Sequence, residues 1–228
     1  MSLVANPDQI ILVDKPAGIS SFGVVAIVRR HLTRLLGRRV KVGHCGTLDP
    51  FATGLLILVS GRNTRRASEF SGLDKVYQAT IRLGARSTTG DPEGEITESH
   101  SRPPSLEHIR EVLSQFTGQI QQVPPSYSAI KVNGRRAYQL ARAGKPVVLS
   151  PRTVWVYALE LVSYSYPELT IKTKVSSGTY IRSLASDMGE RLGTGAYTVA
   201  LRRLSIGSYD VAQAHQLRTE AESGKLTL

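Results

Sequence analysis

The chain has 228 residues, enough for one large domain whose hydrophobic core needs no disulfide support. Hydrophobic residues make up 41% of it, a share that is typical of globular proteins and excludes a disordered or collagen-like chain. The 29 lysines and arginines exceed the 18 acids by 11, and this net charge favours a polyanionic partner. The longest apolar run, residues 154 to 159, is far shorter than the roughly 20 residues that cross a bilayer.

The N-terminal sequence lacks the basic head and the long apolar centre of a signal peptide. We therefore predict a cytoplasmic protein with no membrane partner. Cys45 is the single cysteine, so no internal disulfide can form, and the five histidines have no metal-ligand spacing with it. The sequence therefore predicts no structural metal.

Basic residues gather in two stretches that are almost free of acids. Between residues 14 and 69 the chain has ten basic residues and one acid, Asp49. Residues 112 to 159 contain no acid, and their basic residues are interleaved with aromatic ones. This combination suits a polyphosphate whose bases can stack on protein rings, so a nucleic acid is favoured over a basic surface that only keeps the protein soluble. Residues 69 to 111 hold eight acids and five bases, and predict an ordinary solvated surface.

The predicted elements begin with a short buried strand at residues 9 to 13. A helix follows, because Ser20 or Ser21 can cap its start, apolar residues then recur at helical spacing, and Gly37 can end it. Several arginines lie off the apolar stripe of this helix, so we expect one face to pack and the cationic face to be exposed. These arginines are Arg29, Arg30 and Arg34.

Five further segments follow before the last third of the chain. Residues 55 to 59 predict a continuous apolar strand, and residues 76 to 83 an alternating, half-buried strand that runs into the turn-rich sequence STTGDPEG. Residues 105 to 116 predict a helix. Residues 126 to 132 and 136 to 143 predict a strand and a helix that are joined by a tight Asn-Gly turn.

The last third predicts a pair of strands, a helix and a final strand. They cover residues 154 to 162, 169 to 176, 180 to 192 and 197 to 208. Strands outnumber helices and often follow one another, so the fold class is α+β, with a mixed, mostly antiparallel central sheet flanked by helices. We expect residues 1 to 228 to form a single domain with one continuous core.

The most distinctive segment is the loop GHCGTLDPFATG at residues 43 to 54. Its glycines and its proline indicate a tight, preshaped loop whose backbone can approach a ligand closely. The loop leads into the predicted apolar strand, which gives its side chains a rigid base. Asp49 is its candidate functional carboxylate, although an Asp followed by Pro is also a common helix cap or turn pair.

This loop and the segments around it resemble the TruB family of tRNA pseudouridine synthases. The matching segments are VDKPAGISS, GHCGTLDPFATGLLILVSGRNTR, KVYQATIRLG, VPPSYSAIKVNGRRAYQLAR and SSGTYIRSLASDMGERLGTGAYTVALRRL, in family order. The resemblance implies that the chain isomerises uridine to pseudouridine in the T-loop of tRNA, at nucleotide 55. It also implies the pseudouridine synthase fold, with one catalytic domain here and with the C-terminal RNA-binding (PUA-like) domain of many members absent or truncated.

Pseudouridine formation breaks the bond between N1 and the ribose, turns the base and rebuilds the bond through C5, so it needs no cofactor. The sequence contains neither a P-loop nor a dinucleotide-binding fingerprint, and we predict no cofactor. The reaction needs an ionised nucleophile and a group that removes the C5 proton. The resemblance implies that Asp49 is the nucleophile on a flipped-out uridine, that Arg182 pairs with Asp49, and that Tyr77 stacks on the base and assists at C5.

The resemblance further implies a set of substrate-binding residues. His44 fills the space that the flipped nucleotide leaves, and Lys15 and Pro16 support the loop around the nucleophile. The other members line the pocket or contact the RNA, and they are Gly43, Leu48, Tyr180, Leu201, Arg142 and Lys131.

Plainer roles stay open for several of these residues. Arg182 could be an ordinary surface arginine on a helix, and Tyr77 and Leu201 could be core residues. His44 could be a turn histidine bonded to backbone, and Lys15 a solvated lysine. The sequence by itself does not choose between these roles.

The predicted partner is the T-arm stem-loop of tRNA. We expect a stand-alone, guide-independent monomer that needs no protein partner. The main alternative is a non-catalytic RNA-binding protein or tRNA-folding chaperone with the same grip on the T-arm. A second alternative is a guide-RNA-dependent relative within a ribonucleoprotein.

Overall fold

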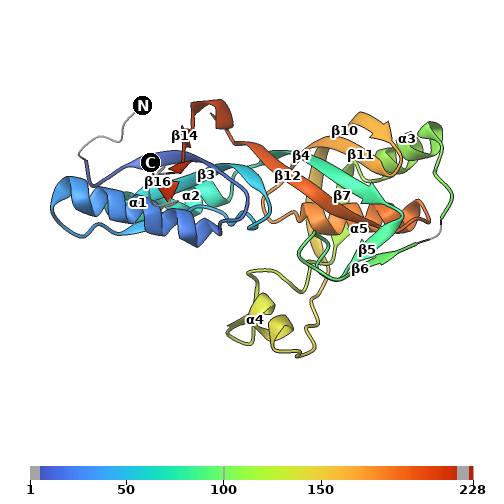
Figure 1. The fold of residues 1–228 in the computed structure, drawn as a ribbon, viewed down its shortest axis with the longest axis horizontal. Coiled ribbons are helices and arrows are strands. Elements are labelled where there is room, and N and C mark those ends of the chain that lie inside the picture. Colours follow the sequence, from blue (N-terminus) through green and yellow to red (C-terminus); the bar gives the residue numbers. More distant parts are fainter. Residues whose placement is uncertain (1–5, 100, 220–225, 228) are drawn as a thin grey trace. The chain divides into compact units, whose positions relative to one another are not determined.

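The structure is a computed structural model that describes residues 6–99, 101–219 and 226–227 (Figure 1). Its fold is α+β with a mixed, mostly antiparallel sheet, as predicted. The chain forms two compact units, unit 1 with Met1–Val76 and Arg202–Leu228 and unit 2 with Tyr77–Leu201. Two strands, β4 (Lys75–Leu83) and β12 (Ala196–Ile206), run from one unit into the other. That all 228 residues act as one catalytic domain stays a prediction.

The sheet of unit 1 has the strand order β14-β1-β3-β12, with β2 also paired to β3. β1 runs antiparallel to β3 and β12 runs parallel to it, so Gly54 at the start of β3 lies opposite both Lys15 and Arg203. The strands not yet given bounds are β1 (Ile10–Lys15), β2 (Val42–His44), β3 (Thr53–Ser60), β13 (Tyr209–Asp210) and β14 (His215–Gln216). A separate pair joins β15 (Arg218–Thr219) to β16 (Leu226–Thr227).

The helix α1 (Ser21–Leu36) forms as its sequence predicts. The Ser20 hydroxyl accepts a hydrogen bond from the Gly23 N–H at 3.0 Å, and Gly37 ends the helix in the left-handed conformation, with φ 64°. The apolar stripe of α1 packs on alternate residues of β1 and β3. This cluster contains Ile11, Val13, Val24, Val25, Val28, Leu32, Val40, Leu56 and Leu58.

β3 is buried on both faces, which explains its continuous apolar sequence. Its other set of alternate residues, Leu55, Ile57 and Val59, packs with Phe70 and Ile206. Phe70 belongs to α2 (Ala67–Ser71), which follows the 3₁₀ helix η1 (Gly61–Arg66). The strand prediction for residues 55 to 59 is therefore confirmed. Neither α2 nor η1 was predicted, because each is too short to show a period.

Unit 2 contains the strand order β12-β4-β11-β10-β7. The long strand β10 runs antiparallel to β11 and to β7, which confirms the predicted strand pair. The helix α3 contacts β10 and α5. The bounds are β5 (Ala85–Ser87), β6 (Ile96–Glu98), α3 (Leu106–Gln115), β7 (Gly118–Gln122), β10 (Arg152–Ser165), β11 (Glu168–Val175) and α5 (Ile181–Arg191).

Two of the predicted strands differ from the structure. Only Lys131–Val132 (β8) of residues 126 to 132 is extended, and it pairs with Arg135–Arg136 (β9) across the predicted Asn-Gly turn before α4 (Ala137–Arg142). The carbonyls of residues 127 to 130 accept bonds from side chains or from the α4 region, so they are not available to a sheet ladder. β12 is also not the final strand, because four short strands follow it.

No helix within the described residues is long and apolar enough to cross a membrane. The helices predicted near residues 20, 105, 136 and 180 are all present as α1, α3, α4 and α5. Caps explain the agreement for α1 and α3, since the Ser105 hydroxyl accepts a bond from the His108 N–H at 3.2 Å.

Gly54 gives the first testable prediction. Its φ is +104°, and a Cβ there would lie 2.2 Å from the carbonyl oxygen of Arg203. Gly54→Ala should therefore lower the free energy of unfolding by about 2 kcal/mol or more, measured by urea denaturation. Gly43→Ala is the matched control, because no atom lies within 4 Å of its added Cβ. Equal losses in the two variants would contradict this account of the Gly54 contact.

Candidate functional site

The loop between β2 and β3 carries Asp49 in a turn. The Ala52 N–H donates to the Asp49 carbonyl at 3.1 Å, and β3 follows directly after. No helix begins at Pro50, so the helix-cap role is wrong and the turn role holds. The Asp49 side chain is half-buried on this turn.

Lys15 ties the loop to the turn that follows β1. Its ammonium donates to the carbonyls of Pro16 and Ile19 at 2.8 Å each, and to that of Pro50 at 3.1 Å. The Gly18 N–H donates to the same Pro50 carbonyl at 2.8 Å. Lys15 is 0% exposed, so its alternative role as a solvated lysine is wrong. The Lys-Pro turn and the residue after Asp49 are thus held by one buried cation.

Ser21 attaches the start of α1 to the same loop. Its hydroxyl donates to the Leu48 carbonyl and accepts from the Leu48 N–H, each at 2.8 Å. Both residues are buried, so water does not compete for these bonds. The residue before Asp49 is therefore fixed to the first turn of a helix.

Arg203 is a buried residue that was not predicted, and it fixes the first part of the loop. Its guanidinium donates to the Leu55 carbonyl at 2.7 Å and to the carbonyls of Thr47 and Gly46 at 3.3 Å each. Arg203 is 1% exposed. The available sequence signal was an arginine within a predicted strand. Its role depends on backbone that lies 148 residues away in sequence.

The buried cations of unit 1 influence one another. Burial, and second the charge of Arg203, lowers the pKa of Lys75 to about 8. The Lys75 ammonium donates to the carbonyls of Ser71 and Leu73, as Lys15 and Arg203 do to carbonyls of the loop. Backbone oxygens thus compensate these charges.

The first two residues of the loop lie in β2, and Cys45 follows directly after this strand. His44 lies in β2 opposite Leu58 and is half-buried, so its alternative role as a turn histidine is wrong. Gly43 precedes it in the same strand. The Cys45 N–H donates to the Ile57 carbonyl at 2.9 Å, and burial raises the pKa of the Cys45 thiol to about 11. The thiol therefore stays protonated at neutral pH and is a poor nucleophile.

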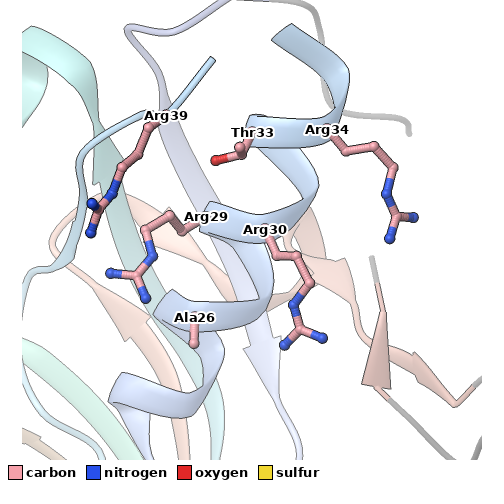
Figure 2. A pocket seen from close by; sticks show the side chains of 6 residues that line it. All are labelled: Ala26, Arg29, Arg30, Thr33, Arg34 and Arg39. Carbon is pink, nitrogen blue, oxygen red and sulfur yellow. The ribbon is translucent and has the colours of Figure 1, made fainter. Parts of the chain in front are cut away.

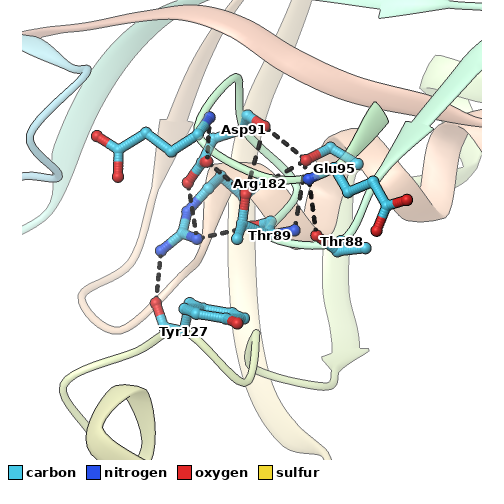
Figure 3. A network of polar contacts seen from close by, with 8 residues as sticks. Thr88, Thr89, Asp91, Glu95, Tyr127 and Arg182 are labelled. Atoms are coloured by element: carbon cyan, nitrogen blue, oxygen red, sulfur yellow. Dashed lines mark hydrogen bonds and ion pairs between the residues drawn. The ribbon is translucent and has the colours of Figure 1, made fainter. Parts of the chain in front are cut away.

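In unit 2, Arg182 at the start of α5 lies in a buried polar network (Figure 3). Its guanidinium pairs with the Asp91 carboxylate at 3.0 Å and donates to the carbonyls of Thr89 at 2.7 Å and Tyr127 at 2.9 Å. The Arg182 side chain is 4% exposed, so its alternative role as a surface arginine is wrong. Asp49 belongs to unit 1 and Arg182 to unit 2, and the pairing of the two stays a prediction.

Asp91 was not predicted as a site residue. It lies in the stretch that was expected to be a solvated surface, and for this acid that expectation is wrong, since its side chain is 6% exposed. One carboxylate oxygen pairs with Arg182, and the other accepts from the Thr89 hydroxyl and from the Glu93 N–H. The available signal was an Asp-Pro pair in a glycine-containing turn, the same local pattern as at Asp49.

A small hollow of about 180 Å³ lies beside Arg182. Its walls include the turn at Thr89, the segment at Tyr127 and the first turns of α5. The start of α5 is itself clamped, because the buried Gln122 side chain accepts from the Tyr180 N–H at 2.8 Å and donates to the Tyr180 carbonyl at 3.0 Å. Tyr180 and Arg182 are therefore held together.

The remaining predicted residues are spread over unit 2. Tyr77 on β4 and Leu201 on β12 are 7% and 6% exposed, which agrees with core packing and with a closed pocket alike. Lys131 and Arg142 are exposed, and the Arg142 guanidinium lies 5.7 Å from the centre of the Tyr138 ring. The roles of these four residues stay predictions.

Exposed aromatic and basic side chains meet on β10 and β11. The rings of Trp155 and Tyr157 stack with centroids 6.4 Å apart, and the Lys174 ammonium lies 5.7 Å from the centre of the Tyr157 ring. Each of the two aromatic residues is 47% exposed. Trp155 and Tyr157 of the interleaved stretch thus lie on the surface, where Lys174, from outside that stretch, joins them. Stacking of RNA bases there stays a prediction.

Arg203→Lys tests the bracing of the loop. A lysine keeps the charge but cannot reach all three carbonyls, so the free energy of unfolding should fall by about 3 kcal/mol in urea denaturation. Arg202→Lys is the matched control, because Arg202 pairs with Asp14 at 2.7 Å on a partly exposed surface. That control should cost less than about 1 kcal/mol. The bracing role is refuted if both variants lose the same stability.

Asp91→Ala tests the buried pair. The change leaves the Arg182 guanidinium without its carboxylate, and should lower the free energy of unfolding by about 3 to 5 kcal/mol. The control is Glu190→Ala, which removes the exposed partner of Arg86 and should change stability far less. Thermal and urea denaturation of both variants measure the difference, and an Asp91 variant as stable as its control would contradict the burial of this charge.

Comparison with known proteins places these features in one family. Residues 33–181 match the family described as "TruB family pseudouridylate synthase (N terminal domain)", and residues 182–223 match "tRNA pseudouridylate synthase B C-terminal domain". The curated tRNA pseudouridine synthase B of Leifsonia xyli is 49% identical over 92% of this chain and 70% of its own length. The corresponding protein of Aquifex aeolicus is 44% identical over 92% and 72%.

Solved structures agree in fold. A chain in a Cbf5-Nop10-Gar1 complex superposes with a TM-score of 0.69 at 29% identity, covering 93% of this chain and 53% of that one. A second, from an H/ACA RNP bound to a substrate RNA containing 2'-deoxyuridine, has a TM-score of 0.64 at 27% identity and covers 91% and 50%. This chain thus spans about half the length of those two chains. The match to the family over more than half of its residues shows that the chain belongs to the TruB family of pseudouridylate synthases.

Proposed function

We propose that this chain, a pseudouridine synthase and therefore an isomerase, converts uridine 55 in the T-loop of tRNA to pseudouridine without a guide RNA. The observation that carries the proposal is the loop of Asp49. Asp49 is the one acid between residues 14 and 69, and buried cations bind the backbone of its loop on both sides. The curated relatives named tRNA pseudouridine synthase B support tRNA as the substrate. We place the enzyme in the cytoplasm with this RNA.

Asp49 is the proposed nucleophile on a uridine flipped out of the T-loop. Its carboxylate adds to C6 of the base or to C1′ of the ribose, and the N1–C1′ bond breaks with its electron pair on the base. The base turns, C5 bonds to C1′ and the bond to Asp49 breaks. The C5 proton leaves to a base, and N1, which kept the electron pair of the broken bond, takes up a proton. Atoms balance without a cofactor, because substrate and product are isomers.

The surroundings of Asp49 support its position. Lys15 donates to the carbonyl of the next residue, Pro50, and Arg203 donates to the carbonyl of Thr47, so two buried cations contact the loop on either side of the carboxylate. A backbone held on both sides keeps the nucleophile in place before RNA binds, and this preorganisation lowers the barrier.

Arg182 is the proposed second charge at Asp49. Its bonds to Asp91, Thr89 and Tyr127 restrict the side chain, and it lies at the wall of the small hollow in unit 2. Asp91 thereby acts as a positioning residue, since it orients Arg182. Tyr77 is the proposed stacking partner of the base.

The proposed RNA contacts fall into two groups. His44, Gly43 and Leu48 belong to the Asp49 loop, and the Lys15–Pro16 turn supports it. Tyr180 and Leu201 line the pocket, and the exposed Lys131 and Arg142 contact phosphates of the T-arm. The exposure of the last two supports an electrostatic role.

Asp49→Asn tests the proposal. The variant should still bind a T-arm stem-loop, but its rate of tritium release from 5-labelled uridine should fall by at least about a thousandfold. The measurement uses the purified chain alone, with no guide RNA and no other protein. Glu69→Gln is the matched control, because it removes an exposed carboxylate of the same unit and should keep full activity.

Three outcomes would contradict the proposal in different ways. Turnover by the Asp49 variant would refute its role as nucleophile. Tight stem-loop binding without any tritium release by the wild type would favour the RNA-binding or chaperone alternative. Release by the wild type only after a guide RNA is added would favour the guide-dependent alternative.

A further inference from the structure

The exposed face of α1 carries a hollow whose walls are four arginines (Figure 2). Arg29, Arg30 and Arg34 come from the helix, and Arg39 comes from the segment that follows it. The hollow has a volume of about 560 Å³, and it is separate from the Asp49 loop and from the hollow beside Arg182.

The helix period explains the shape of this hollow. Val28 and Leu32 face the sheet and are 0% exposed, which directs the arginines between them outward. Ala26 and Thr33 line the hollow too, and their small side chains leave room between the guanidinium groups. Gly37 ends the helix in a left-handed conformation, and the chain then returns so that Arg39 extends beside Arg29 (Figure 2).

The four guanidinium groups place four positive charges on one face of α1. Within the described part of the chain none of them forms an ion pair or a side-chain hydrogen bond. Other arginines of unit 1 are paired, as Arg62 is with Asp8 and Arg66 with Glu69. Adjacent arginines repel one another, so this arrangement suits an anion that neutralises several of them together.

We infer that this arginine hollow binds the sugar-phosphate backbone of the tRNA, a few nucleotides away from the modified uridine. Guanidinium groups bind phosphate oxygens in a bidentate way, and the hollow offers several groups to neighbouring phosphates. The inference deepens the proposed function and rests on it, since it assigns a second contact to the same RNA.

The position of α1 relative to the Asp49 loop supports this assignment. Ser21, in the first turn of α1, is bonded to Leu48, the residue before Asp49. With a rise of 1.5 Å per residue, Arg29 and Arg34 lie about 12 and about 20 Å from Ser21 along the helix axis. At roughly 3.4 Å per nucleotide in a stacked strand, this distance corresponds to about four to six nucleotides. A stacked strand of that length therefore spans the axial distance from Ser21, which is bonded to the Asp49 loop, to the arginine hollow.

The test compares two triple variants with the same loss of charge. R29Q/R30Q/R34Q removes three walls of the hollow, and R102Q/R110Q/R191Q removes three exposed arginines of unit 2. For the first variant the Kd of a tRNA transcript should rise at least tenfold, and the slope of log Kd against log salt should fall by about 2 to 3. Its kcat for tritium release at saturating tRNA should stay within twofold of the wild type.

The control variant should change the Kd by less than threefold. The inference is overturned if the two variants bind tRNA equally well. If R29Q/R30Q/R34Q releases no tritium even at saturating tRNA, while the wild type and the control do, the arginines act in catalysis. The inference of a backbone contact is then overturned as well. Absence of release from the wild type would refute the proposed function, whereas normal release with equal binding by the two variants would refute only this inference.

If R29Q/R30Q/R34Q does not fold, a measurement on the wild type tests whether tRNA covers the arginine hollow. Phenylglyoxal modifies exposed arginines, and mass spectrometry locates the modified residues. Bound tRNA should protect Arg29, Arg30 and Arg34, while Arg102 and Arg110 should stay reactive. Protection by an acidic polyglutamate peptide, without protection by tRNA, would overturn the proposal in favour of an acidic protein partner.

Discussion

The need to compensate buried positive charge is the constraint on which unit 1 depends. Lys15 and Arg203 lie on either side of Gly54 in neighbouring strands, and both are almost completely buried. Their described partners are backbone carbonyls, among them those of Gly46, Thr47 and Pro50. Because a buried cation is costly without such acceptors, the loop keeps the conformation that presents these oxygens. The carboxylate of Asp49 is thus carried by a backbone that is fixed at both ends.

In unit 2 a carboxylate compensates the charge of a buried arginine. Arg182 is buried at the start of α5, and Asp91 supplies the opposite charge. The carbonyls of Thr89 and Tyr127 accept the other hydrogen bonds of the guanidinium. Each oxygen of Asp91 is used, so neither charge can turn away without leaving the other uncompensated. A guanidinium held in this way has a fixed orientation.

The uneven charge along the chain has two structural meanings. Some basic residues of the first stretch are inside the protein, where Lys15 binds carbonyls and fixes backbone. Others lie outside, where Arg29, Arg30 and Arg34 line an open hollow on α1. Net charge alone does not separate these uses, because an internal and an external cation count equally. Burial separates them, because it assigns the first group to the scaffold and leaves the second group on the surface.

The sequence by itself determined the features that depend on neighbours along the chain. The caps at Ser20 and Gly37 and the apolar period fix α1, the continuous apolar run fixes β3, and the ordered motifs identify the family. Only the tertiary structure decided that Arg203 braces the Asp49 loop and that Asp91 is buried against Arg182. These pairs join residues about 90 to 160 positions apart, and local patterns contain no information on which distant carbonyl or carboxylate a cation meets. The fold supplies it, because strand pairing brings those backbones together.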